Sequence, residues 1–164
     1  PVGAVAGRAE VMAVFEAHDR KAPLPHGGTF NANPVTMVAG KTCMALMDQA
    51  AFDRLNGLGE TVRARLREAF ALANTEGQVS GQASLFRLHL HSRPMRSYRD
   101  AWSPPAEKTA MAVLHRRLID DGVFISPTGM GCLSTAMTET EIDRLAEATL
   151  AGLRHLREDG RLPQ

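Results

Sequence analysis

Residues 26–34 combine the residue types that bind an anion. The segment reads H-G-G-T-F-N-A-N-P. Two glycines let a ligand approach the backbone closely, and Thr29 adds a hydroxyl. Asn33 can cap a helix that begins at Pro34, and the free N–H groups of a helix N-terminus favour phosphate. The segment therefore predicts either a phosphate-binding loop or a glycine-rich turn that serves helix stability alone.

A second group of polar side chains lies on one face of a predicted strand. Arg87, His89 and His91 alternate with apolar residues, so they point to the same side. Two histidines are only part of a metal site, and no Cys, Asp or Glu stands near them at ligand spacing. We therefore expect structural histidines and no metal site, which also argues against a metal-dependent hydrolase. Arg87 could hold a substrate carboxylate or form an ordinary ion pair.

Hydrophobic spacing and turn residues predict the elements that position these groups. A capping box at 138–141 opens the last helix, and Gly122 stops the one before it. The arginines at 63, 65 and 67 are expected on a solvated face. Helices are expected over 8–17, 34–47, 49–73, 106–121 and from 139 onward, and strands over 2–6, 78–91, 123–125 and 131–136.

The order of these elements suggests two domains with a break near Met47. Residues 1–48 read as a segment that completes a larger α/β domain. Residues 49–164 read as a small α+β domain, with helices over a sheet. Residues 92–103 form an irregular connection within it, where Arg93 and Arg96 are weaker candidates for a substrate contact.

Composition excludes several classes of protein. The net charge of +1, with no basic run among aromatics, argues against a nucleic-acid partner. No apolar stretch approaches the length of a membrane span, so no membrane partner is expected. Cys43 and Cys132 lie far apart without metal-type spacing, which suggests reduced thiols and a cytoplasmic protein.

Several motifs resemble the class III pyridoxal-phosphate (PLP) aminotransferases. Residues 28–34 match the family's G-T-(F/L)-(N/S)-(A/G)-N-P, and residues 1–8 match P-(V/I)-G-A-x-x-G-(R/K). Residues 122–127 match G-(V/I)-(Y/F)-x-(S/A)-P, and residues 134–138 match S-x-A-(H/M)-T. The resemblance covers nearly the whole chain. It implies an α/β protein of PLP-dependent transferase fold type I, with 1–48 ending the large domain and 49–164 forming the small one.

The resemblance also implies where the site lies. Gly28 and Thr29 would bind the cofactor phosphate of the other subunit of a homodimer. Arg87 and His26 are the candidates for contact with a small amino acid or amine substrate, and Met130 could border its pocket. The lysine that forms the Schiff base with the cofactor is expected upstream of Pro1, so Lys21, Lys41 and Lys108 are expected to be solvated. The chain is thus predicted to be a C-terminal portion of a longer enzyme and inactive alone.

The reaction is expected to move an amino group between an amino acid or amine and a keto acid or aldehyde. Within the family the sequence looks closest to the glutamate-1-semialdehyde aminomutase branch. Residues 28–34 depart from that enzyme's usual G-T-L-S-G-N-P, and residues 87–91 replace its aromatic-rich strand. These departures favour a transaminase and leave the aminomutase as an alternative. A non-catalytic α+β binding module is the second alternative.

Overall fold

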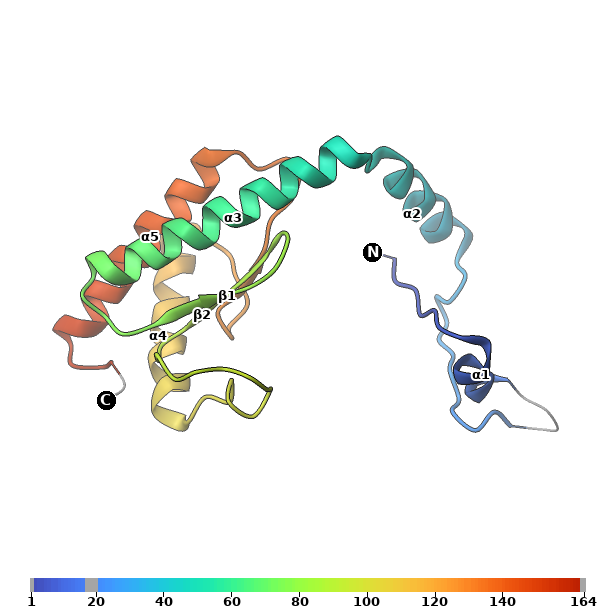
Figure 1. Cartoon of the computed structure of the whole chain (residues 1–164), viewed down its shortest axis with the longest axis horizontal. Helices are drawn as coiled ribbons and strands as arrows, with labels where there is room; N and C mark the ends of the chain where they lie inside the picture. Colours follow the sequence, from blue (N-terminus) through green and yellow to red (C-terminus); the bar gives the residue numbers. More distant parts are fainter. Residues whose placement is uncertain (1, 17–20, 163–164) are drawn as a thin grey trace. The chain divides into compact units, whose positions relative to one another are not determined.

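The computed structural model describes residues 2–16 and 21–162. The chain divides into two compact units, residues 1–48 and residues 49–164 (Figure 1). This division coincides with the predicted break near Met47. The assignment of the two units to the large and small domains of the family stays a prediction.

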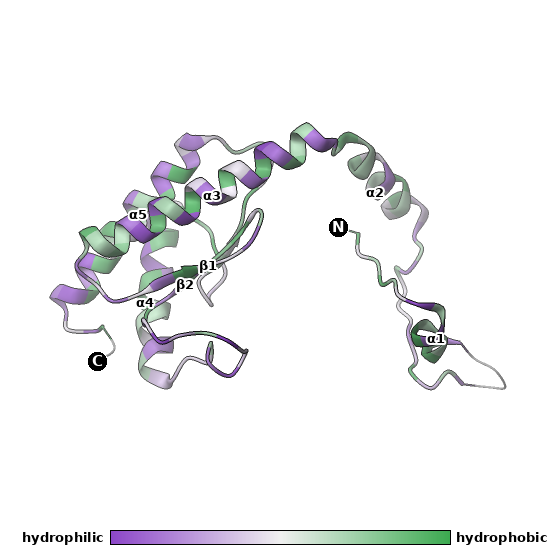
Figure 2. Cartoon of the chain, viewed as in Figure 1, coloured by the Kyte–Doolittle hydropathy of each residue, from purple (hydrophilic) through white to green (hydrophobic). Residues whose placement is uncertain are grey.

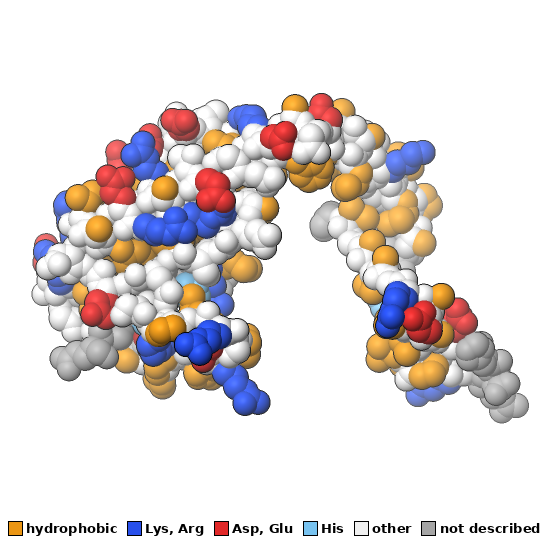
Figure 3. All heavy atoms as spheres, viewed as in Figure 1, with side chains coloured by type: hydrophobic (Ala, Val, Ile, Leu, Met, Phe, Trp, Pro, Cys, Tyr) orange, Lys and Arg blue, Asp and Glu red, His pale blue; other side chains and the backbone are white. Residues whose placement is uncertain are grey.

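The first unit is mostly exposed and has no core of its own among its described residues. It holds α1 (Ala9–Met12), the short 3₁₀ helix η1 (Ala13–Phe15) and α2 (Pro34–Leu46). Gly40 is the one buried residue among those described in this unit, and the side chain of Val2 packs on it. Helix α2 is apolar along most of its length (Figure 2), and hydrophobic side chains cover much of its surface (Figure 3). Such a surface needs a partner to cover it.

The strand predicted over residues 2–6 is absent. These residues form neither helix nor strand, since no strand in the described part of the first unit lies beside them to complete a hydrogen-bonded ladder. The helix predicted over 8–17 is confirmed as α1 and η1, although Ala17 lies outside the described residues.

The second unit packs three helices against a small sheet. Its elements are α3 (Gln49–Leu72), β1 (Gln78–Ser80), β2 (Leu85–His89), α4 (Pro105–Asp120), β3 (Met130–Cys132) and α5 (Glu139–Glu158). The antiparallel sheet has the order β1-β2-β3, with Val79 opposite Leu88 and Phe86 opposite Gly131. These elements confirm the α+β layer expected for this part of the chain.

The core of the second unit comes from one face of each element. Helix α5 lies along α3, and α4 packs on α5. The predicted apolar face of β2 and its continuation is confirmed, because Phe86, Leu88 and Leu90 are all buried; His89 and His91, from the other face, are buried as well. The hydrophobic side chains among the largest with less than 2% exposure are Leu88, Val62, Leu66, Leu114, Leu118, Ile142, Leu153 and Leu156.

Helix ends follow the predicted signals. Asn33 caps α2 by accepting a hydrogen bond from the N–H of Thr36, and Pro34 begins the helix. Thr138 and Glu141 form the capping box that opens α5. Gly122 follows α4 with a φ of 77°, a conformation that favours glycine.

Two predicted strands are wrong in whole or in part. Residues 123–125 form a loop, because the N–H of Val123 bonds to the carbonyl of Leu118 and so completes the end of α4. Strand β3 stops at Cys132. The carbonyl groups of Thr135 and Met137, beyond it, accept hydrogen bonds from the guanidinium of Arg54 on α3.

Arg63 also corrects the prediction of a solvated arginine face. Its side chain is buried and donates hydrogen bonds to the carbonyls of Ala83 (2.7 Å) and Leu85 (2.9 Å). The same guanidinium pairs with Glu60 at 2.7 Å. Arg63 therefore ties α3 to the β1–β2 turn.

None of the described helices is long and apolar enough to cross a membrane.

Candidate functional site

The loop before α2 is built from two consecutive turns. The N–H of Asn31 donates to the carbonyl of Gly28 at 3.0 Å, and that of Asn33 donates to Phe30 at 3.2 Å. Ala32 takes a φ of 55°, in the left-handed region. The Asn33 cap then fixes the entry into the helix, so that the loop presents residues 27–31 at the surface beside a helix N-terminus.

Gly28 and Thr29 are exposed and available to a ligand. Neither the hydroxyl nor the backbone N–H of Thr29 bonds to any described residue. A Cβ placed on Gly27 would meet nothing within 4 Å, so the backbone on that side is open. Unsatisfied donors beside a helix N-terminus suit a phosphate group. Gly28 and Thr29 are therefore candidates for contact with an anion.

His26 lies in the same loop but makes a different contact. Its ring packs edge-on against Phe15, with centroids 5.4 Å apart. It also lines a hollow of about 440 Å³ within the first unit, together with Phe30 and Asn31. Neither Gly28 nor Thr29 lines that hollow, and the packing on Phe15 supports the loop.

Arg87 lies on β2, in the second unit, opposite Met130 of β3. The guanidinium is partly exposed, and its Nε donates to the carbonyl of Thr128 at 3.3 Å. No carboxylate pairs with it among the described residues. Arg87 is therefore free to bind an anion, and the structure brings it together with Met130 as candidate site residues.

His89 in β2 and His91 just after it each lie close to a neighbouring polar side chain. His89 Nε2 lies 2.8 Å from Ser80 Oγ, and His91 Nδ1 lies 3.3 Å from Gln78 Nε2. Burial, with the nearby Arg87 charge, lowers the pKa of His89 to about 4. Burial and Arg93 lower the pKa of His91. Both imidazoles are therefore neutral at pH 7 and act in packing and hydrogen bonding. No group of three metal-ligating side chains occurs in residues 2–16 and 21–162.

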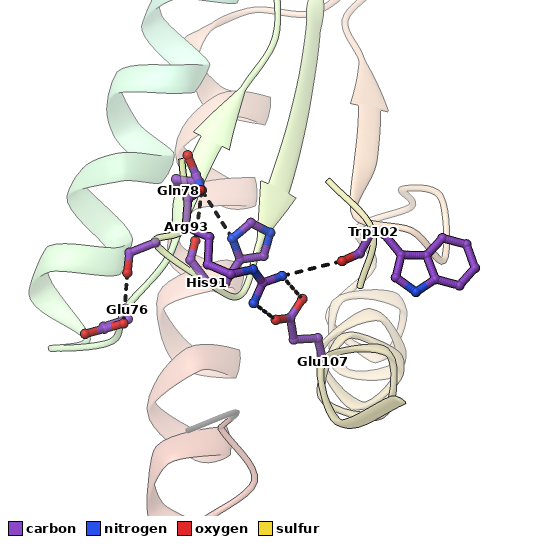
Figure 4. Close-up of polar contacts among 7 residues, drawn as sticks. Glu76, Gln78, His91, Arg93, Trp102 and Glu107 are labelled. Atoms are coloured by element: carbon purple, nitrogen blue, oxygen red, sulfur yellow. Dashed lines mark hydrogen bonds and ion pairs between the residues drawn. The ribbon is translucent and has the colours of Figure 1, made fainter. Parts of the chain in front are cut away.

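An ion pair with a buried carboxylate lies beside His91, and no pattern in the sequence predicts it (Figure 4). Glu107 on α4 is only 4% exposed and pairs through both oxygens with Arg93. Burial raises the pKa of Glu107, but the hydrogen bonds and charge of Arg93 outweigh it and leave that pKa below its usual value. The weak substrate candidate Arg93 is thus already neutralised. Arg96 lies exposed in the neighbouring loop.

Similar proteins agree on one family. No family profile matches the chain. The glutamate-1-semialdehyde 2,1-aminomutase of Methanothermobacter thermautotrophicus is 34% identical over 160 residues, which is 94% of this chain and 37% of that protein. The β-phenylalanine transaminase of Variovorax paradoxus is 35% identical over 147 residues, which is 89% of this chain and 33% of that protein.

Solved structures of transaminases also superpose on this chain. An ω-transaminase from Sphaerobacter thermophilus superposes with a TM-score of 0.79 at 45% identity, over 92% of this chain and 34% of that one. A transaminase with PLP bound gives a TM-score of 0.73 at 36% identity, over 95% and 35% of the two chains. The chain thus spans about a third of the length of the proteins it matches. The homologues and structural neighbours of this chain are thus class III, fold-type-I PLP-dependent aminotransferases and aminomutases, and the chain is similar to about a third of their length.

Proposed function

We propose that this chain is part of a PLP-dependent enzyme that moves an amino group between an amino acid or amine and a keto acid or aldehyde. The single observation that supports this most is the 45% identity to an ω-transaminase over 92% of the chain. The β-phenylalanine transaminase supports the same reaction class. The aminomutase stays a second candidate, because a relative of that name is 34% identical over 94% of the chain.

Gly28 and Thr29 would bind the cofactor phosphate through backbone N–H groups and the Thr29 hydroxyl. PLP, when bound, supplies the electron sink for the amino-group chemistry. In that arrangement the loop holds the phosphate by charge-assisted hydrogen bonds, and the fixed α2 N-terminus adds a favourable dipole. The unbonded donors of Thr29 support this role.

A homodimer would complete the site across its interface. The support is the first unit, whose apolar side chains lack a core: Phe30, Val35 and Leu46 are each at least 75% exposed. Covering this surface by a second subunit would bring Gly28 and Thr29 to the partner's cofactor. In this proposal residues 1–48 end the large domain, residues 49–164 form the small domain, and the protein is cytoplasmic.

Arg87 would hold the carboxylate of the substrate, since it is free of a carboxylate partner in the described part of the chain. His26 would stand at the border of the phosphate loop. The non-catalytic binding module predicts none of these contacts.

The test measures how tightly two ligands bind to the cofactor-bearing protein that contains this chain. The ligands are PLP and pyridoxal, which lacks the phosphate. Thr29→Ala is expected to weaken PLP binding by about tenfold to a hundredfold, because a charge-assisted hydrogen bond is lost. Pyridoxal binding should not change. Thr42→Ala is the matched control, since Thr42 is also exposed but lies further along α2. Equal PLP affinity in Thr29→Ala and Thr42→Ala would contradict the assignment.

A further inference from the structure

A separate pocket of about 270 Å³ lies wholly within the second unit. Strand β2 and its continuation form one wall, the loop of residues 98–103 forms the second, and the first turns of α4 form the third. This volume is near the lower end of small-molecule sites and suits a ligand about the size of a substituted phenyl ring.

The charges around this pocket leave it positive. Arg87 and Lys108 both line it, and neither pairs with a carboxylate among the described residues. The carboxylate of Glu107 also lines it but is neutralised by the two hydrogen bonds from Arg93. His89 contributes no charge at pH 7, because its pKa lies near 4. Two unneutralised cations therefore face the pocket, and they favour an anion.

Apolar and aromatic side chains make up much of the remaining lining of these walls. Leu90 and Met111 line the pocket, as does Trp102, a residue that is 57% exposed. The Lys108 ammonium lies 3.9 Å from the centre of the Trp102 ring, so the aromatic surface and the cation are held side by side. In Figure 4 the Trp102 ring points away from the Arg93–Glu107 pair, which the Trp102 carbonyl contacts instead. A ligand here would meet a cation and an aromatic face together.

We propose that this pocket binds a small carboxylate that carries an aromatic or bulky aliphatic body. Arg87 and Lys108 hold the carboxylate, while Trp102 and Met111 pack against the body. The ligand has two possible sources with this chemistry. It is the carboxylate end of the amino substrate, a reading that rests on the proposed function, or it is a free carboxylic acid that acts as an effector.

A probe that carries both a carboxylate and an aromatic body tests the proposal directly. Ligand-observed NMR follows the addition of 3-phenylpropionate to the cofactor-bearing protein that contains this chain. We expect saturable binding in the millimolar range or tighter. Two analogues should each bind at least about tenfold more weakly. 3-Phenylpropionamide lacks the negative charge, and acetate lacks the aromatic body.

Variants test the two cations. Arg87→Met and Lys108→Met are each expected to weaken 3-phenylpropionate binding about tenfold. Arg67→Met removes the same charge from an exposed position of α3 outside the pocket and should not change the affinity. Circular dichroism checks that the variants keep their fold.

Kinetics of the cofactor-bearing enzyme distinguish the two sources. Competitive inhibition by 3-phenylpropionate, with a higher KM for the amino acid in Arg87→Met, assigns the pocket to the substrate. Noncompetitive inhibition assigns it to an effector. The proposal is overturned if the chain binds 3-phenylpropionate no better than the amide, or if Arg67→Met weakens binding as much as Arg87→Met. The PLP affinity of Thr29→Ala is independent of this outcome, so the two proposals fail separately.

Discussion

Gly59 of α3 lies against the backbone of Ala83 in the β1–β2 turn. A Cβ at residue 59 would come within 1.8 Å of the Ala83 carbonyl oxygen. One helical turn further on, Arg63 donates a hydrogen bond to the same oxygen. The absence of a side chain at Gly59 therefore lets the hairpin approach α3 closely enough for a buried arginine to satisfy its carbonyls.

Gly59→Ala is therefore expected to destabilise the second unit by about 1–3 kcal/mol, because the added methyl displaces the hairpin. Gly57→Ala is the matched control in the same helix, since a Cβ there would meet nothing within 4 Å. It should stabilise the protein by about 0.5–1 kcal/mol through helix propensity. Urea unfolding followed by circular dichroism measures both. Equal effects of the two substitutions would contradict the close approach.

His89 predicts a loss of stability in mild acid. Burial lowers its pKa from 6.5 to about 4, and Arg87 and His91 oppose its protonation, whereas Glu107 favours it. Below pH 6.5 the unfolded chain gains a proton that the folded chain does not, so the free energy of unfolding falls as pH drops toward 4 and then levels off. The full effect is roughly 3 kcal/mol.

His89→Gln should flatten this part of the stability–pH curve, because the amide can still bond to Ser80 but does not titrate. Urea titrations between pH 7 and pH 4 measure the slope. A variant with the same slope as the wild type would show that another group is responsible. His26→Gln provides the comparison, because His26 is exposed in the first unit.

The Arg93–Glu107 pair predicts a position-specific effect in the irregular loop. Arg93→Met leaves a buried carboxylate without its partner and should cost about 2 kcal/mol, less than a fully buried pair because Arg93 is half exposed. Arg96→Met, three residues along the loop, should change the free energy of unfolding by less than about 0.5 kcal/mol. Thermal or urea unfolding compares the two. Similar costs would indicate that the pair contributes nothing specific.

Local signals predicted the parts of the fold that depend on neighbouring residues. The Asn33 cap, the 138–141 capping box and the alternation of β2 are each set within a few residues, and all three are confirmed. The two failed strands have different causes. The N–H of Val123 bonds to the carbonyl of Leu118 and so completes the end of α4, which is a local contact. The guanidinium of Arg54 binds the carbonyls expected to extend β3, across more than 80 residues of sequence.

Only the part of the candidate site that lies within one contiguous motif could be predicted from the sequence. The loop around Gly28 and Thr29 is contiguous, so its turns and cap follow from its own residues. The pocket around Trp102 and Lys108 draws on β2, α4 and the loop between them, and no spacing in the sequence brings these together. Glu107 was missed for the same reason, because its partner Arg93 lies in an irregular connection.

The most direct test of the central claim is peptide mass spectrometry of the protein from its natural source after borohydride reduction. Reduction fixes PLP to the lysine that carries it. We predict a pyridoxyl group on a lysine outside these 164 residues, and none on Lys21, Lys41 or Lys108. A protein with no pyridoxyl group would contradict the PLP-enzyme account, and modification of one of those three lysines would contradict the expected position of the catalytic lysine.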